Sequence, residues 1–186
     1  WMATKASLNR YDGSNFKQFT THSTPTYAIT SNQTTALFED SKKRLWIGTQ
    51  NGDLNLYDAR TQRFYHCFLD NKKNKNQTAG QHIYCMAEDS KGNIWVGTIV
   101  GKIFKITLSE ELKKGDFPNE EDFTAQIKVI PLKTSLPPTV RINFIKLLKN
   151  NQLVVGSQAG YGQIDYLKNQ YIPIILNPVG TNRYLS

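Results

Sequence analysis

One eleven-residue block occurs twice in this sequence, and no other feature constrains the fold as strongly. Residues 39–49 read EDSKKRLWIGT and residues 88–98 read EDSKGNIWVGT. A truncated copy, WMAT, opens the chain at residues 1–4, and a degenerate copy, LVVGS, lies at residues 153–157. The unit is about 45 residues long plus insertions, which indicates a chain of repeated structural units, each packed on the next.

Each unit has the pattern of a small antiparallel sheet. Residues 34–68 contain four short runs, TTALFED, RLWIGT, DLNLYD and QRFYHCF, separated by short polar turns. This alternation predicts a four-stranded meander. Because one such sheet cannot bury both of its faces alone, sheets of this size stack around an axis as the blades of a β-propeller.

We therefore predict an all-β chain with about four blade equivalents. The predicted parts are a partial blade at 1–20, blades at 34–68, 83–132 and 142–175, and the first strand of a further blade at 181–186. Residues 108–138 form an insertion, for which we predict one or two helical turns and then the fourth strand of that blade. Gly52 and Gly101 are expected in turns with positive φ.

The composition limits the class of protein. The chain has 186 residues, of which 39% are hydrophobic, so a core is available, and it has no run of about 18 apolar residues that would predict a membrane-spanning helix. Its two cysteines do not make a disulfide framework. We place Cys67 on the outermost strand of one blade and Cys85 on the innermost strand of the next, and expect both to be free thiols.

The repeat pattern A-L-F-E-D-S-K-x-x-L-W-I-G-T-x-x-G-x-L-N-x-Y-D, best matched at 34–58 and 83–106, resembles the two-component regulator propeller repeat. The resemblance implies seven-bladed propellers in the periplasmic sensor region of hybrid two-component systems from glycan-degrading bacteria. It implies an oligosaccharide ligand, a membrane-anchored parent protein with a histidine kinase, and a homodimer. We predict no cofactor, and we predict no nucleic-acid partner because nothing apart from the basic charge resembles a nucleic-acid-binding module.

The start and end of the sequence bear on ring closure. Because the chain begins inside a repeat, we expect it to be a piece of a longer protein. Residues 181–186 could pair beside residues 1–4 and close a ring of four blades. Since the family it resembles has seven blades, we expect an open arc instead.

Repeated aromatic and acidic residues have a structural interpretation and a functional one. Trp46 and Trp95 could stack on sugars, but a repeated position between apolar residues indicates packing between blades. Asp40 and Asp89 could be metal ligands, but they lack the spacing of a calcium loop, so capping of a turn is the better explanation. We predict no metal site.

Signals for catalysis are few. The three histidines have no metal-binding partners at a known spacing, and no nucleophile elbow or phosphate-binding loop is present. We therefore predict no catalytic residues and no enzymatic activity for this segment. The net charge of +8, with a basic run at 72–75, gives a modest preference for an anionic ligand.

A set of polar residues recurs just before the innermost strand of each unit. In a propeller this position opens beside the axial channel, where every blade contributes to a ligand site. One interpretation is a polar lining, with Tyr84 offering a stacking face; the other is that first-strand positions are simply solvated. Both stay open. The candidate ligand-binding residues are Gln33, His82, Tyr84, Arg141 and Arg183.

Three functions are compatible with these features. The first is part of an extracytoplasmic, ligand-sensing propeller that regulates a histidine kinase. The second is a propeller-fold enzyme such as a lyase, which would require a histidine beside an acid or a metal at the channel mouth, where only His82 is suitably placed. The third is a scaffold for protein–protein interaction.

Overall fold

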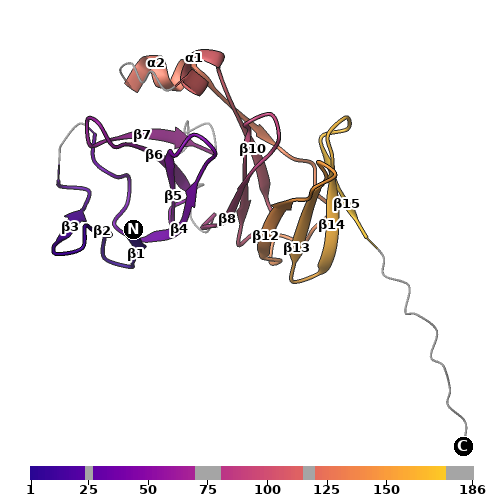
Figure 1. Cartoon of the computed structure of the whole chain (residues 1–186). Coiled ribbons are helices and arrows are strands. Elements are labelled where there is room, and N and C mark those ends of the chain that lie inside the picture. The colour runs from indigo at the N-terminus through magenta and orange to yellow at the C-terminus, as the bar shows by residue number, and fades with distance from the viewer. Residues whose placement is uncertain (24–26, 70–80, 115–119, 175–186) are drawn as a thin grey trace, which may run out of the picture.

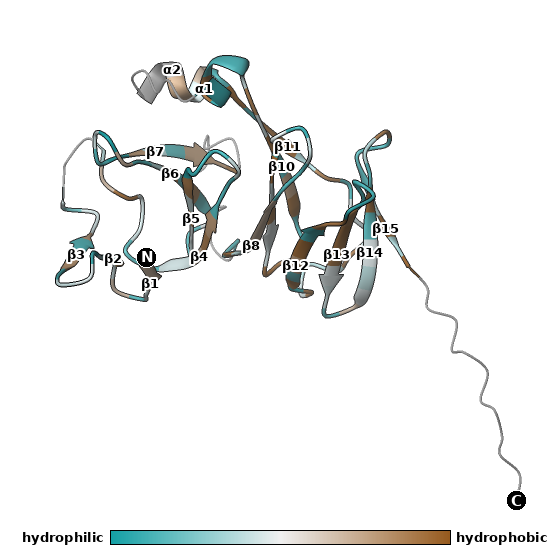
Figure 2. Ribbon diagram, viewed as in Figure 1, coloured by the Kyte–Doolittle hydropathy of each residue, from teal (hydrophilic) through white to brown (hydrophobic). Residues whose placement is uncertain are grey.

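The structure is a computed structural model of the chain and describes residues 1–23, 27–69, 81–114 and 120–174. Four antiparallel sheets follow one another along the chain, which confirms the predicted all-β propeller architecture (Figure 1). We call them blades 1 to 4. Hydrophobic residues gather within the strands, whereas the turns are hydrophilic (Figure 2).

Blade 1 has three strands and the other blades have four, each paired in chain order as a meander. The strands of blades 1 and 2 are β1 (Met2–Ala3), β2 (Leu8–Tyr11), β3 (Phe16–Phe19), β4 (Thr34–Glu39), β5 (Leu45–Thr49), β6 (Asp53–Asp58) and β7 (Arg63–Phe68). The strands of blades 3 and 4 are β8 (Ile83–Glu88), β9 (Ile94–Thr98), β10 (Ile103–Leu108), β11 (Ile127–Pro131), β12 (Ile142–Leu147), β13 (Leu153–Ser157), β14 (Gly160–Asp165) and β15 (Gln170–Pro173). The first strands β1, β4, β8 and β12 contact one another in chain order, so they are the innermost strands.

The turn between the first two strands of a blade is organised by a buried aspartate. Asp40 accepts the backbone N–H groups of Lys42 and Arg44 at 2.9 and 3.0 Å, and its other oxygen accepts the Trp46 indole N–H at 2.9 Å. In blade 3, Asp89 binds Lys91, Asn93 and Trp95 in the same way, at 2.9 Å in each case. The aspartates cap turns, as the structural interpretation predicts, and they also bind the indole N–H groups of the tryptophans, which the sequence did not indicate.

Both tryptophans are core residues. Trp46 is 0% exposed and Trp95 is 1% exposed, and each packs in a hydrophobic cluster with residues of its own blade and of the following blade. They have no surface free for stacking on a sugar. The prediction of packing over ligand binding is therefore correct for these two residues.

The glycine of each Gly-Thr pair makes room for the next blade. A Cβ atom placed on Gly48 would lie 2.5 Å from Cγ2 of Ile83, and one on Gly97 would lie 2.6 Å from Cγ2 of Ile142. We expected these glycines to allow close approach of backbone. The approaching group is instead the isoleucine side chain that begins the innermost strand of the following blade. Gly52 and Gly101 have φ of +80° and +71°, as predicted.

The insertion adds two short helices outside the meander of blade 3. Helix α1 (Glu110–Lys114) and helix α2 (Glu120–Ala125) precede β11, which pairs with β10 as predicted. Leu112 and Phe123 are fully buried, and the Phe123 ring lies 5.1 Å from that of Tyr65 in β7. The helices therefore cover the joint between blades 2 and 3, above β7 in Figure 1.

The segments that connect blades also extend the following sheet. The Phe64 N–H of β7 donates to the carbonyl of Tyr27 at 3.0 Å. Lys133 forms a parallel bridge to Gln170 of β15, and the Tyr171 N–H donates to the carbonyl of Lys133 at 3.0 Å. Each of these linkers covers part of the outermost strand of the next blade, which reduces the unpaired edge that a β-sheet exposes.

Both cysteines are free thiols on the predicted strands, Cys67 on β7 and Cys85 on β8. Cys67 is fully buried and Cys85 half-buried, and burial raises the pKa of each thiol to about 12. Since only the thiolate is nucleophilic, we expect neither cysteine to react with iodoacetamide at pH 8 while the chain is folded, and both to react in denaturant. Mass spectrometry of the alkylated chain checks this; rapid labelling of native Cys67 would contradict it.

Two segments named from the sequence lie outside the described residues: the basic run 72–75 and the predicted further strand 181–186. Within the described part of the chain, the two helices are five and six residues long, and neither could span a membrane.

Candidate functional site

The innermost strand begins with an irregularity in each of blades 2, 3 and 4. Its pairing with the second strand shifts register between Thr34 and Ala36, between Ile83 and Cys85, and between Ile142 and Phe144. One residue in each blade is thus left out of the ladder, as in a β-bulge, which redirects its side chain. These bulged residues are Thr35, Tyr84 and Asn143, and all three are exposed.

Three of the candidate residues, Gln33, His82 and Arg141, lie two positions before the bulged residues and are also equivalent between blades. The carbonyls of Gln33, His82 and Arg141 accept the backbone N–H groups of Gln50, Ile99 and Gln158, at 3.0, 3.1 and 3.1 Å. This shared bond places the candidate residues Gln33, His82 and Arg141 at the same end of their blades. The alignment from which they were chosen therefore matches their position in the structure.

Blades 3 and 4 bring three of these side chains together. The Arg141 guanidinium lies over the Tyr84 ring, 4.6 Å from its centroid, and Arg141 Nε donates to Asn143 Oδ1 at 2.9 Å. Tyr84 is 43% exposed, so part of its surface remains open to solvent. We call Tyr84, Arg141 and Asn143 the inner-strand cluster. It joins the bulges of two adjacent blades through one arginine.

The equivalent position of blade 2 is used differently. The Thr35 hydroxyl donates to the carbonyl of Ile83 at 2.7 Å and so ties β4 to β8. Among the described residues, no side-chain hydrogen bond or ring contact joins Gln33 or His82 to the inner-strand cluster. Arg183 lies outside the described residues. Of the five candidates, the structure therefore joins Arg141 and Tyr84, and it adds Asn143, which sequence reasoning did not select.

The cluster has the chemistry of a hydrogen-bonding site for an oxygen-rich ligand. The Nε of Arg141 is bound to Asn143, and among the described residues no carboxylate forms an ion pair with this guanidinium. Its terminal N–H groups can therefore donate to a ligand, and they can do so in pairs to a carboxylate or sulfate. The stacked Tyr84 ring restrains the guanidinium, so less side-chain entropy is lost on binding.

A metal or acid–base centre is not evident near the cluster. No group of three His, Cys, Asp or Glu residues in the described part of the chain could hold a metal ion. The carboxylates of Asp40 and Asp89 are hydrogen-bonded to their turns and tryptophans, at the end of the innermost strand opposite the bulges. The arrangement supports binding by an arginine, an aromatic ring and an amide.

Comparison with known families gives a match to the repeats. The family model described as two component regulator propeller matches residues 28–51 and 79–99. These two stretches contain the eleven-residue blocks at 39–49 and 88–98, so the resemblance inferred from the sequence is confirmed. No curated protein matches the chain significantly.

Solved structures share the fold at low sequence identity. The extracellular domain of a hybrid two-component system from B. thetaiotaomicron is 17% identical with a TM-score of 0.71, over 97% of this chain and 21% of that one. A virginiamycin B lyase from Staphylococcus aureus is 14% identical with a TM-score of 0.60, over 91% of this chain and 49% of the lyase. PorZ of Porphyromonas gingivalis is 16% identical with a TM-score of 0.58, over 93% of this chain and 25% of PorZ. The chain thus spans a fifth to a half of the length of these structures.

Proposed function

We propose that this chain, which carries two-component regulator propeller repeats, is part of the ligand-sensing propeller of a hybrid two-component signalling protein. In this proposal the propeller lies outside the cytoplasm, in the periplasm, and its parent protein is anchored in the membrane and acts as a homodimer. Ligand binding biases the activity of a downstream histidine kinase. The match of the repeats and the shared fold of a two-component extracellular domain support this.

The inner-strand cluster is the observation that carries the binding role. The exposed residues at the bulges lie within the innermost strands, where several blades can contribute to one site. Tyr84 comes from blade 3 and both Arg141 and Asn143 come from blade 4, so a ligand here contacts two blades at once. Such a ligand could change how the two blades sit against each other.

The ligand class that this cluster fits is an oligosaccharide, with a preference for an anionic one. Sugar hydroxyls pair with arginine N–H groups and with the asparagine amide. A carboxylate or sulfate on the sugar would add a bidentate, charge-assisted contact to Arg141. The net charge of +8 favours the approach of such a ligand.

Replacement of Arg141 by alanine should weaken oligosaccharide binding to the intact sensor by about 1–3 kcal/mol, the usual range for loss of a hydrogen bond to a charged group. The change should leave the melting temperature almost unchanged, because Arg141 lies at the rim and not in the core. Calorimetric titration with neutral, uronate-containing and sulfated oligosaccharides measures the effect and ranks the ligand classes.

Gln33→Ala provides the matched control, because Gln33 has the same position in blade 2 but is not part of the cluster. It should bind as the unmodified sensor does. Arg141→Lys should give an intermediate affinity, since lysine keeps the charge but loses the planar pair of donors. Equal affinities for the unmodified, Arg141→Ala and Tyr84→Ala proteins would rule the cluster out as the ligand site.

A lyase remains the second candidate function, because a lyase is among the structures that share the fold. A lyase would need a base at the same rim, and His82 is the histidine placed there. Incubation of the intact protein with the oligosaccharides that it binds distinguishes the two. Appearance of cleaved product that is lost in His82→Ala would favour the enzyme.

A further inference from the structure

A second candidate site lies at the opposite end of the innermost strands, in the turns that Asp40 and Asp89 organise. The two turns are built by the same bonds. The Lys43 and Gly92 N–H groups donate back to the carbonyls of Asp40 and Asp89, at 2.9 and 3.0 Å. Both turns have a serine directly after the aspartate, Ser41 in blade 2 and Ser90 in blade 3.

In blade 2 this serine binds a carboxylate. The backbone N–H of Ser41 donates to Glu88 Oε2 at 2.7 Å, and its hydroxyl donates to Glu88 Oε1 at 2.8 Å. Glu88 is the last residue of β8, so the contact joins blade 2 to blade 3. The turn therefore forms a cradle with two donors, one for each oxygen of a carboxylate.

In blade 3 the same cradle has no carboxylate from the chain. Glu88 pairs with Ile94 at the end of β8, and Leu147 occupies the equivalent place at the end of β12, where it pairs with Leu153. A leucine cannot accept a hydrogen bond. Within the described ranges, neither the N–H nor the hydroxyl of Ser90 forms a hydrogen bond, and Ser90 is exposed.

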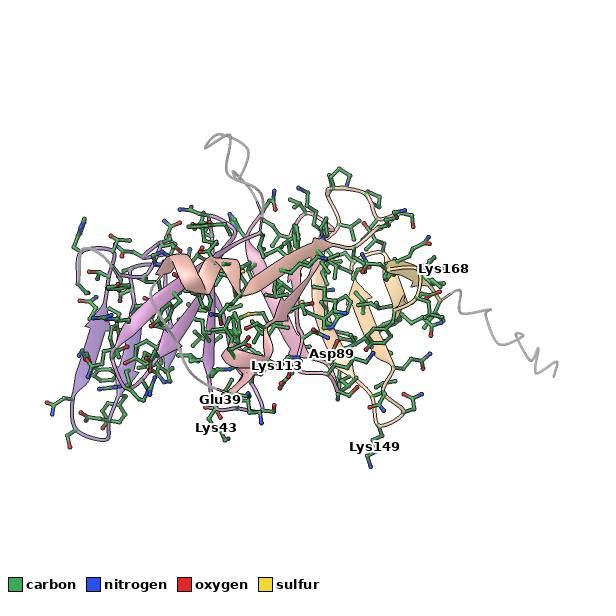
Figure 3. All side chains as sticks on the ribbon, turned by 90° about the horizontal axis from the view of Figure 1, so that it is seen from above. Glu39, Lys43, Asp89, Lys113, Lys149 and Lys168 are labelled. Atoms are coloured by element: carbon green, nitrogen blue, oxygen red, sulfur yellow. The ribbon has the colours of Figure 1, made fainter. Side chains whose placement is uncertain are left out.

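The surroundings of Ser90 are basic. Ser90 and Leu147 line a cleft with a volume of about 470 Å³, together with the cations Lys42, Lys91 and Lys113. The carboxylates in this cleft are Glu88, which is held by Ser41, and Asp89, which is held by its turn and by Trp95. Figure 3 labels Asp89 and Lys113, which both line this cleft. Lys113 is paired with Glu110 and Arg44 with Asp40, each at 2.7 Å. Among the described residues, Lys42 and Lys91 are therefore the cations of the cleft without a carboxylate partner, and they supply positive charge for an anion.

We propose that the Ser90 cradle binds a carboxylate supplied by a ligand, in the geometry that Ser41 and Glu88 show in the neighbouring turn. The ligand class is a small carboxylate, of which a uronate sugar is the form that a glycan would supply. The lysines of the cleft would add charge-assisted contacts to those of Ser90. This site lies on the face opposite the inner-strand cluster, so it does not depend on the function proposed above.

Saturation-transfer NMR on the intact protein tests the site with glucuronate, acetate and glucose as probes. The measurements are made in the Arg141→Ala background, so that the inner-strand cluster does not contribute. Glucuronate and acetate should show saturation transfer and glucose should not. Equal affinity of acetate and glucuronate would identify a site for any small carboxylate, whereas tighter binding of glucuronate would identify the sugar as part of the ligand.

Two variants assign the binding to the cradle. Ser90→Ala should weaken glucuronate binding about tenfold, the loss of roughly one charge-assisted hydrogen bond. Leu147→Glu should abolish binding, because it supplies the carboxylate from within the chain as Glu88 does. Absence of saturation transfer from both carboxylates, or unchanged binding in Ser90→Ala and in folded Leu147→Glu, would overturn the proposal.

Discussion

Substitution of Gly97 by alanine is expected to lower the free energy of unfolding by about 2 kcal/mol, within the usual cost of overfilling a packed core. The added Cβ would lie 2.6 Å from Cγ2 of Ile142 and 2.7 Å from Sγ of Cys85. Ile142 is fully buried, so it cannot move aside without opening the joint between blades 3 and 4. Urea unfolding of the 186-residue chain, followed by tryptophan fluorescence, measures the change.

Gly156→Ala is the control, because Gly156 has the same position in blade 4. Its added Cβ would meet the ring of Phe144, whose side chain is 40% exposed and can rotate outward. The cost should be clearly smaller than for Gly97. If Gly97→Ala and Gly156→Ala lower the free energy of unfolding equally, the loss comes from the glycine position in the strand itself and not from the contact between blades.

Replacement of Asp89 by alanine is expected to cost about 3 kcal/mol in unfolding free energy. The side chain accepts hydrogen bonds from two backbone N–H groups, the Asn93 amide and the Trp95 indole. Its loss leaves the buried indole N–H without an acceptor, and an unsatisfied buried donor costs roughly 1–3 kcal/mol. Differential scanning calorimetry measures the loss of stability, and the tryptophan emission spectrum of the Asp89→Ala chain, compared with that of the unmodified chain, reports the altered indole environment.

Asp89→Asn should recover part of this stability, since its amide oxygen can still accept either the backbone N–H groups or the Trp95 indole N–H, although not both. Asp165→Ala is a further control, because among the described residues the Asp165 side chain accepts hydrogen bonds from the N–H groups of Leu167 and Lys168 alone, in an exposed turn. It should cost well under half as much as Asp89→Ala. Equal losses for Asp89 and Asp165 would show that the indole bond contributes little.

The repeat was sufficient to predict the blades, their turns and the buried tryptophans. Apolar runs of five to six residues and the aspartate before each turn are local signals, and the structure places them as expected. The partner of Gly97 was not predictable, because Ile142 is distant in sequence and reaches it only when blade 4 stacks on blade 3. The glycine signal indicated close packing without identifying the approaching group.

The candidate site was predicted in part. Alignment of the repeats selected Arg141 and Tyr84, which the structure joins. It did not reveal the bulges, because the register shift arises from pairing with the second strand and leaves no distinct residue type in the sequence. The same alignment places Thr35, Tyr84 and Asn143 at one repeat position, but only Tyr84 was selected, for its aromatic ring. The sequence did not show that Thr35 is bonded to Ile83.

The bulges also bear on how such a propeller can change its ligand during evolution. A bulged residue makes no ladder pair, so its identity is not fixed by the packing of the sheet. Threonine, tyrosine and asparagine occupy this position in three blades of otherwise similar backbone. Thr35 also ties β4 to β8 through its bond to Ile83, so its identity bears on the joint of blades 2 and 3. If the inner-strand cluster is the ligand site, mutations at Tyr84 and Asn143 alter what is recognised while the joints made by Gly48 and Gly97 remain intact. Selectivity would then drift separately from stability in blades 3 and 4.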